Sequence, residues 1–276
     1  MLEDVVAPAG PFRLRHVARS GVWQGSLPDG RVVVAWQLGD GRVVLQAPDE
    51  ECLSTGRFML ALDDDTSGFH ERFARDPLLG PSARALVGFR PLRRATVTHS
   101  VVRALCGQLI EARRALAIER AIARACGATV ITQDALRRLA PVELRRLGLA
   151  QHRATALARL ASTIDLERLR DLPGDVVDAR LARERCIGPW SLGLIALEGL
   201  GRFDRGLVGD LALVKLHAAL SGRWVEGAET AALLAPYGEW QGLACEVLLR
   251  GWSRGLVPGA SVDRARIARR RERRAA

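Results

Sequence analysis

The chain has 276 residues, of which 48% are apolar and 26% are charged. This length and composition allow a sizeable buried core, and they exclude both a disulfide-stapled miniprotein and a wholly disordered chain. The formal net charge of +10 favours a polyanionic partner such as nucleic acid.

The first ninety residues predict an antiparallel β-sheet. Val32, Val34 and Trp36 alternate with their neighbours, and a Gly-Asp-Gly turn at 39–41 joins this run to the next apolar run, 43–45. We therefore expect a β-rich N-terminal domain over residues 1–90. It carries a net charge of −2, whereas residues 91–276 carry +12.

From about Thr98 the apolar residues recur with a helical period, and this pattern predicts one long helix that ends near Gly127. Further helical stretches follow, separated by short connections rich in Gly and Pro. An all-α domain is expected over 91–262, followed by an Arg-rich tail, 263–276. The expected fold class is α+β, with an antiparallel sheet domain followed by a helical domain.

A short hairpin between two helices is predicted within residues 175–190. Asp175 is expected to cap the first helix, which runs to Arg185, and Asp178 occupies the capping-box position. The connection is Cys186-Ile187-Gly188, and Pro189 suits the first turn of the next helix. Free N–H groups at that helix start favour a phosphate, although an ordinary αα-hairpin fits the pattern equally well.

Trp190 and Asp210 are the two candidate chemical groups. Trp190 could line a pocket for a flat base, but it could also be a core residue. Asp210 follows Gly209 and precedes an apolar helix, so its carboxylate can accept helix N–H bonds that favour the charged form. Such a carboxylate suits glycosidic cleavage through a cationic sugar, yet most Asp residues in this position are only caps.

Taken together, the hairpin, the Trp and an Asp twenty residues later resemble the helix-hairpin-helix, Gly-Pro-Asp superfamily of DNA glycosylases, in particular the 3-methyladenine DNA glycosylase II (AlkA) type. The resemblance extends from about Phe69 to Trp252. It includes FARDPLLG at 73–80, GFRP at 88–91, VRALCGQLI at 102–110 and LGL at 147–149. For the sheet before Phe69 the resemblance is one of layout only.

The resemblance implies a role for each matching residue. Asp210 would be the catalytic carboxylate, and Trp190, Leu194 and Leu249 would line the base pocket. Leu109 would fill the gap left by a flipped nucleotide. The residues implied to hold the DNA backbone are Gln108, Arg185, Cys186, Ile187 and Gly188, with a monovalent cation on the hairpin carbonyls as an option and no other cofactor.

The chain departs from the family pattern at three implied positions. Cys186 replaces a Gly, which removes a residue that tolerates positive φ. Leu194 replaces a Tyr, and Leu249 replaces a second pocket Trp unless Trp240 or Trp252 takes that place. Lyase-capable relatives have a lysine at the position of Trp190, and Lys215 lies five residues past Asp210, away from its face of an ideal helix.

The sequence therefore predicts a monofunctional glycosylase that flips alkylated purines out of duplex DNA. The alternatives are a catalytically inactive, lesion-sensing DNA-binding protein and, with no signature to support it, an RNA-binding protein. Cysteines and histidines are scattered without metal-ligand spacing, so no protein-bound transition metal is expected. No apolar run is long enough to span a membrane, and we expect a monomer in the cytoplasm, associated with the nucleoid.

Overall fold

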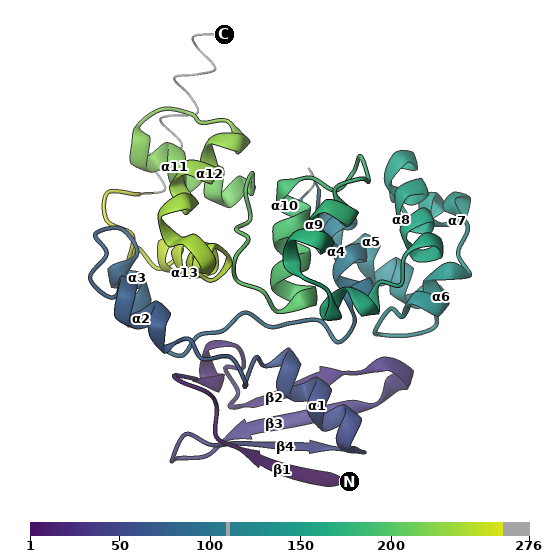
Figure 1. Ribbon diagram of the computed structural model, residues 1–276, viewed down its shortest axis with the longest axis horizontal. Coiled ribbons are helices and arrows are strands. Elements are labelled where there is room, and N and C mark those ends of the chain that lie inside the picture. The colour runs from purple at the N-terminus through teal and green to yellow at the C-terminus, as the bar shows by residue number, and fades with distance from the viewer. Residues whose placement is uncertain (109–110, 262–276) are drawn as a thin grey trace.

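The computed structural model describes residues 1–108 and 111–261. An antiparallel sheet forms the base of the molecule, and helices stand above it (Figure 1). The strand order is β1-β4-β3-β2, and Ala35 of β3 pairs with Leu45 of β4. The strands are β1 Leu2–Val6, β2 Val22–Ser26, β3 Val32–Gln37 and β4 Val43–Ala47.

The expected α+β fold is confirmed. The helices that follow the sheet are α1 Glu50–Met59, α2 Ser67–Phe73, α3 Gly80–Ala85, α4 Val97–Gly107, α5 Ala112–Ala125, α6 Gln133–Arg137, α7 Pro141–Arg146, α8 Gln151–Thr163, α9 Gly174–Leu181, α10 Pro189–Leu194, α11 Leu211–Ser221, α12 Thr230–Leu234 and α13 Gln241–Trp252. A π-helical segment, η4 Ile195–Leu200, continues α10. None of the helices in the described part of the chain is long and apolar enough to cross a membrane.

Helix α1 packs closely on the sheet because Gly56 has no side chain. A Cβ at this position would lie 2.7 Å from the side chain of Val33. The sheet and α1 share one hydrophobic core, which includes Leu45 and Leu53. A separate and larger core holds the helices together, from Phe69 to Ala260.

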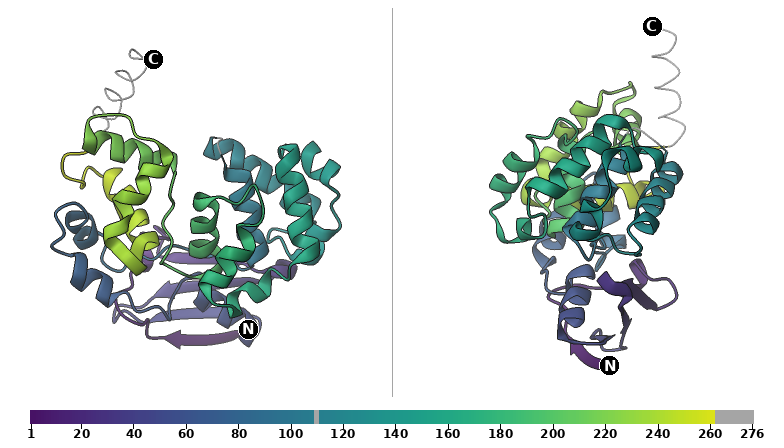
Figure 2. Two further views of the ribbon diagram at one scale, coloured as in Figure 1. Left: turned by 45° about the horizontal axis from the view of Figure 1, so that its top comes forward. Right: turned by 90° about the vertical axis from the view of Figure 1, so that its right-hand side faces the viewer.

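The helices form two groups above the sheet. Helices α2, α3 and α11–α13 make one group, and α4–α10 make the other (Figures 1 and 2). Helix α4 is central to the second group and packs against α5, α8, α10 and η4. The segment from Gly201 to Asp210 connects α10 and η4 in the second group to α11 in the first, so it brings Asp210 back beside α10.

The single long helix predicted from Thr98 to Gly127 is wrong. Helix α4 ends at Gly107, and Gln108 takes an extended backbone conformation, with φ −67° and ψ 126°. The Gln108 side chain there donates to the Cys186 carbonyl and to Ser191 Oγ, contacts that a continuous helix would not give. Leu116, one of the apolar residues that recur with the helical period, is 37% exposed.

The predicted caps of the helix before the hairpin are also wrong. Helix α9 begins at Gly174, so Asp175 lies inside its first turn, and the helix ends at Leu181 rather than Arg185. Asp178 is buried and pairs with Arg202 and Arg205, the latter at 2.6 Å. Its role is therefore to hold α9 to the segment that leads to Asp210.

Candidate active site

Asp210 caps helix α11 and stands where the Gly201–Asp210 connection ends. Gly209, just before it, has φ +86°, a conformation that favours glycine. The Gly209 N–H donates to the hydroxyl of the buried Thr230 at 2.8 Å, and the Asp210 N–H donates to the Leu207 carbonyl at 3.0 Å. Asp210 Oδ1 accepts the N–H of Ala212 at 2.8 Å. The backbone on both sides of Asp210 is therefore fixed.

Trp190 bonds directly to the Asp210 carboxylate. Its indole Nε1–H donates to Oδ2 at 3.1 Å, so the two carboxylate oxygens are held from different helices. Both side chains are only partly buried, and Asp210 is not sealed in the interior. The structure thus brings together the two residues that the sequence singled out twenty positions apart.

Gly107, the last residue of α4, makes room for the Trp190 ring. A Cβ at Gly107 would lie 2.7 Å from Cη2 of the indole. Sequence reasoning missed this residue, because nothing in the local pattern of α4 shows which distant side chain packs on its end.

The hairpin between α9 and α10 is open at Gly188. Gly188 is the N-cap of α10, with φ −95°, and a Cβ built on it would meet no atom within 4 Å. Cys186 is not among the described non-glycine residues with positive φ, which are Asp29 and Ala61. The hairpin therefore accommodates Cys186 without backbone strain. The loss of the family's Gly at this position does not force a non-glycine residue into a positive φ. Ile187 is buried at the hairpin base.

Gln108 joins the end of α4 to this hairpin. The side-chain amide Nε2 of Gln108 donates to Ser191 Oγ at 2.6 Å and to the Cys186 carbonyl. The main-chain carbonyl of Gln108 accepts a hydrogen bond from Arg153 at 2.8 Å. A cation bound on the hairpin carbonyls would have to share the Cys186 carbonyl with this amide. Arg185 is exposed beside the hairpin. Leu109, the residue expected to fill the gap, lies outside the described residues.

The expected pocket leucines lie in the helical core. Leu194 is 6% exposed, and Leu249 is half-buried against the same core. Trp240 stacks on Phe203, with ring centroids 5.8 Å apart, and Trp252 Nε1 donates to the Ala260 carbonyl at 3.0 Å. Both tryptophans thus have structural contacts, and Trp190 is the aromatic residue that bonds to Asp210.

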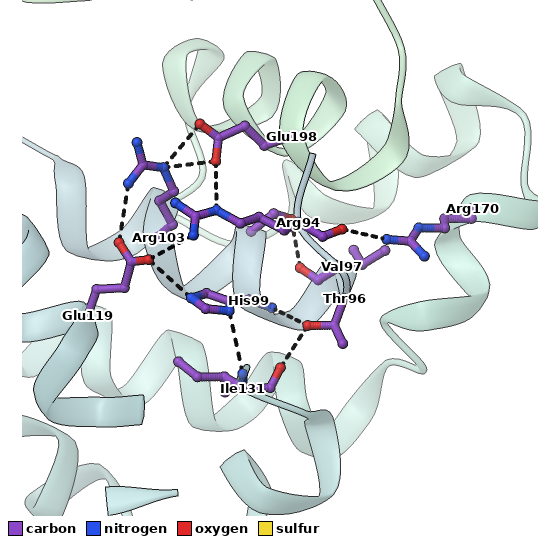
Figure 3. A network of polar contacts seen from close by, with 10 residues as sticks. Arg94, Thr96, Val97, His99, Arg103, Glu119, Ile131, Arg170 and Glu198 are labelled. Carbon is purple, nitrogen blue, oxygen red and sulfur yellow. Dashed lines mark hydrogen bonds and ion pairs between the residues drawn. The ribbon is translucent and has the colours of Figure 1, made fainter. Parts of the chain in front are cut away.

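A network of charged side chains joins α4 and the segment before it to α5 and η4 (Figure 3). Glu198 of η4 accepts Arg94 Nε at 3.1 Å and Arg103 Nε at 2.8 Å. Glu119 of α5 lies 3.0 Å from His99 Nε2 and pairs with the same two arginines. These pairs tie α4, α5 and η4 together.

Burial raises the pKa of Glu119, but the bond to His99 and the charges of Arg94 and Arg103 outweigh burial and hold this pKa below its usual value. The network thus keeps Glu119 ionised inside the helical domain. Sequence reasoning missed it, although an acid within an otherwise apolar helical run, as at Glu198 in IALEGL, is a signal for such a pair.

No set of three or more His, Cys, Asp or Glu side chains suited to a metal ion is present within residues 1–108 and 111–261. The chemical groups gathered at the site are a carboxylate, an indole, an open helix start and the exposed Arg185 beside the hairpin.

Neither protein-family models nor curated protein sequences match this chain. Solved structures do. A 3-methyladenine DNA glycosylase from Archaeoglobus fulgidus has a TM-score of 0.72 at 18% identity, covering 93% of this chain and all of the other. The 8-oxoguanine glycosylase/lyase of Clostridium acetobutylicum in complex with double-stranded DNA has a TM-score of 0.68 at 16% identity, covering 93% of this chain and 99% of the other.

A third similar structure is the Schizosaccharomyces pombe 3-methyladenine DNA glycosylase in complex with abasic DNA. Its TM-score is 0.58 at 15% identity, covering 71% of this chain and all of the other. The chain therefore has the fold of the helix-hairpin-helix DNA glycosylases. Within that fold, the similar structures include both 3-methyladenine and 8-oxoguanine enzymes.

Proposed function

We propose that the protein is a DNA glycosylase that hydrolyses the N-glycosidic bond of alkylated purines in duplex DNA. The observation that carries this proposal is the Asp210 carboxylate, which is held between the first N–H groups of α11 and the indole of Trp190. An oriented, ionised carboxylate stabilises the positive charge that develops on the sugar as the bond breaks. Asp210 would also orient the attacking water.

The leaving base needs little help from the protein. An N-alkylated purine carries a positive charge, so its glycosidic bond is already weak and a general acid is hardly required. A site with one carboxylate and one aromatic wall suits this chemistry. Trp190 would stack on the flipped base, because an indole face attracts a cationic ring. Extraction of the base costs a few kcal/mol and is easiest at a damaged pair.

The hairpin would bind the DNA backbone on the strand that carries the lesion. Gly188 leaves open space at the start of α10, where N–H groups favour a phosphate. Arg185 is exposed next to it. The net charge of +12 over residues 91–276 supplies the longer-range attraction. Because the protein would contact the DNA from one side, one copy of the chain would suffice. It would act in the cytoplasm, where the chromosome lies.

We propose further that the enzyme leaves an intact strand with an abasic site. Strand cleavage by lyase-capable relatives needs a lysine amine, and the only lysine of this chain is Lys215. The position beside the Asp210 carboxylate is occupied by the indole of Trp190, which donates to it. Trp190 cannot form the covalent imine that a lyase requires.

The inactive, lesion-sensing protein is less well supported. A hairpin distorted by Cys186, in place of the family's Gly, would favour that alternative, but Cys186 has no positive φ that would strain the backbone.

The test uses duplexes that each contain one 7-methylguanine, with the lesion strand labelled. The purified protein should release the base and leave the strand whole until alkali is added. Strand breaks without alkali would contradict the monofunctional proposal, and tight binding without release would favour the lesion sensor.

A further inference from the structure

Three separate parts of the chain meet at Gln108. The end of α4, the start of α8 and the hairpin between α9 and α10 belong to one group of helices (Figure 1), and α4 packs against both α8 and α10. Gln108 directly follows α4 and is half-buried. Its main-chain carbonyl accepts from Arg153 of α8, and its side chain reaches the hairpin and α10. One residue therefore connects all three parts.

The side-chain amide of Gln108 donates to groups inside the protein. A glutamine amide has two N–H donors. Nε2 of Gln108 has two acceptors, the Cys186 carbonyl and Ser191 Oγ, the latter at 2.6 Å. Ser191 is only 1% exposed, so this amide is directed into the protein. Donation to a DNA phosphate would require breaking one of these two bonds.

The two acceptors lie on either side of Trp190. Cys186 precedes Trp190 by four residues, and Ser191 follows it directly. One amide thus ties both ends of the short segment that carries the indole. Gly107, the neighbour of Gln108, contacts the ring itself, since a Cβ there would lie 2.7 Å from Cη2. The end of α4 therefore constrains both the backbone and the ring of Trp190.

Trp190 transmits this constraint to the Asp210 carboxylate. Its indole N–H donates to Oδ2 at 3.1 Å, and a hydrogen bond weakens steeply when the donor turns away from the acceptor. A small shift of α10 would weaken this bond, while the bond from the Ala212 N–H to Oδ1 would remain. Gln108 thus influences one oxygen of Asp210 without touching it.

The same amide also holds the hairpin. Cys186 lies two residues before Gly188, the open position at the start of α10. Cys186 Sγ contacts the His152 carbonyl of α8 at 3.7 Å, so the hairpin rests on α8 as well as on the end of α4. The turn proposed to bind a phosphate is therefore held at a fixed place relative to Asp210.

We propose that Gln108 is a positioning residue. It holds the hairpin and α10 in place, so that the indole of Trp190 keeps the Asp210 carboxylate oriented toward the sugar. This inference rests on the proposed function, and it gives Gln108 a different role from the DNA contact that the family resemblance implies. A positioning residue acts on the rate of the chemical step, whereas a DNA contact acts on affinity.

The test removes the two sides of one contact separately. Gln108→Met keeps the length of the side chain and loses both donors, and Ser191→Ala removes one acceptor at a buried position that DNA does not reach. In single-turnover excision of 7-methylguanine at saturating protein, Gln108→Met should be about tenfold slower and Ser191→Ala about threefold slower. The double variant should be within about twofold of Gln108→Met, because both substitutions remove the same contact. Affinity for an undamaged duplex should fall less than about threefold, since the charges that attract the phosphates remain.

A second readout does not depend on catalysis. The indole N–H resonance of Trp190 is identified by its loss from the spectrum of Trp190→Phe. It should shift in both Gln108→Met and Ser191→Ala, because the hydrogen bond to Asp210 changes in each. Gln24→Met is the matched control, since it removes the same amide from an exposed position on β2. It should leave the resonance, the rate and the affinity unchanged.

Weaker binding with an unchanged rate at saturation would overturn the proposal and make Gln108 a DNA contact. An unshifted Trp190 resonance, or effects of the two substitutions that multiply in the double variant, would overturn it as well. If the wild type releases no base, the proposed function fails. The Trp190 resonance then still decides whether Gln108 positions the indole, because a shift in both variants supports that role and no shift excludes it.

Discussion

Removing the hydrogen bond between Trp190 and Asp210 should slow base excision. Trp190→Phe deletes the indole N–H that donates to Oδ2 at 3.1 Å and keeps an aromatic ring next to Gly107. A hydrogen bond to a charged group contributes about 1.5–3 kcal/mol, and because both side chains are partly exposed we take about 1–2 kcal/mol. This corresponds to roughly a 5- to 30-fold lower rate.

The assay is single-turnover release of 7-methylguanine from a duplex, with enzyme in excess. A double-mutant cycle in urea then isolates the bond itself, using wild type, Trp190→Phe, Asp210→Ala and the double variant. The cycle should give a coupling of about 1–2 kcal/mol, well above the ~0.5 kcal/mol by which independent sites depart from additivity. An unchanged excision rate together with additive stabilities would refute the claim that Trp190 positions the carboxylate.

Three further predictions follow from the geometry. Gly188→Ala should fold with unchanged or slightly higher stability, because the φ of Gly188 suits alanine and the added Cβ meets open space. The variant should nevertheless bind duplex DNA several-fold more weakly in fluorescence anisotropy. An unchanged affinity would argue against phosphate binding at the hairpin. Glu119→Gln should lose about 3 kcal/mol of unfolding free energy at pH 7. Because the pKa of Glu119 is lowered in the folded protein, this loss should shrink as the pH falls below about 4. A loss that stays constant across pH would contradict the ion pairs. Glu246→Gln should melt a few degrees higher than wild type at pH 8, because burial disfavours the ionised Glu246 in the folded state. This gain in melting temperature should vanish in acid. A lower melting temperature at pH 8 would contradict the claim that burial disfavours the charged side chain.

The sheet and the helix cap at Asp210 could be predicted from the sequence because their signals are local. Alternating valines and a glycine-rich turn define β3 and β4. Gly209 followed by Asp210 and an apolar run gives the cap of α11. The pairing of Asp210 with Trp190 came from the resemblance to known glycosylases rather than from the spacing itself.

The break between α4 and α5 could not be predicted in this way. The apolar period continues across it, and the contacts that compete with a continuous helix come from residues far along the chain. Gln108 bonds to a carbonyl 78 residues away, and Trp190 occupies the space beside Gly107. Tertiary contacts of this kind override local helix propensity.

The charged network was missed for a related reason. Arg94, Arg103, Glu119 and Glu198 come from four separate places in the chain and meet only in the folded protein (Figure 3). Local charge patterns indicate solvent-exposed pairs, whereas these pairs lie between packed helices. Asp178, predicted as a cap, is likewise paired with distant arginines.

The central claim is that the Asp210 carboxylate drives base release, and Asp210→Asn tests it most directly. The amide has the size of the carboxylate and can still accept the N–H of Ala212, but it has no negative charge. Methylated duplex DNA is incubated with each protein, and the released bases are separated and quantified. The wild type should release methylated purines, and Asp210→Asn should bind the DNA but release them at least about 100-fold more slowly. Release by Asp210→Asn at the wild-type rate would contradict the account.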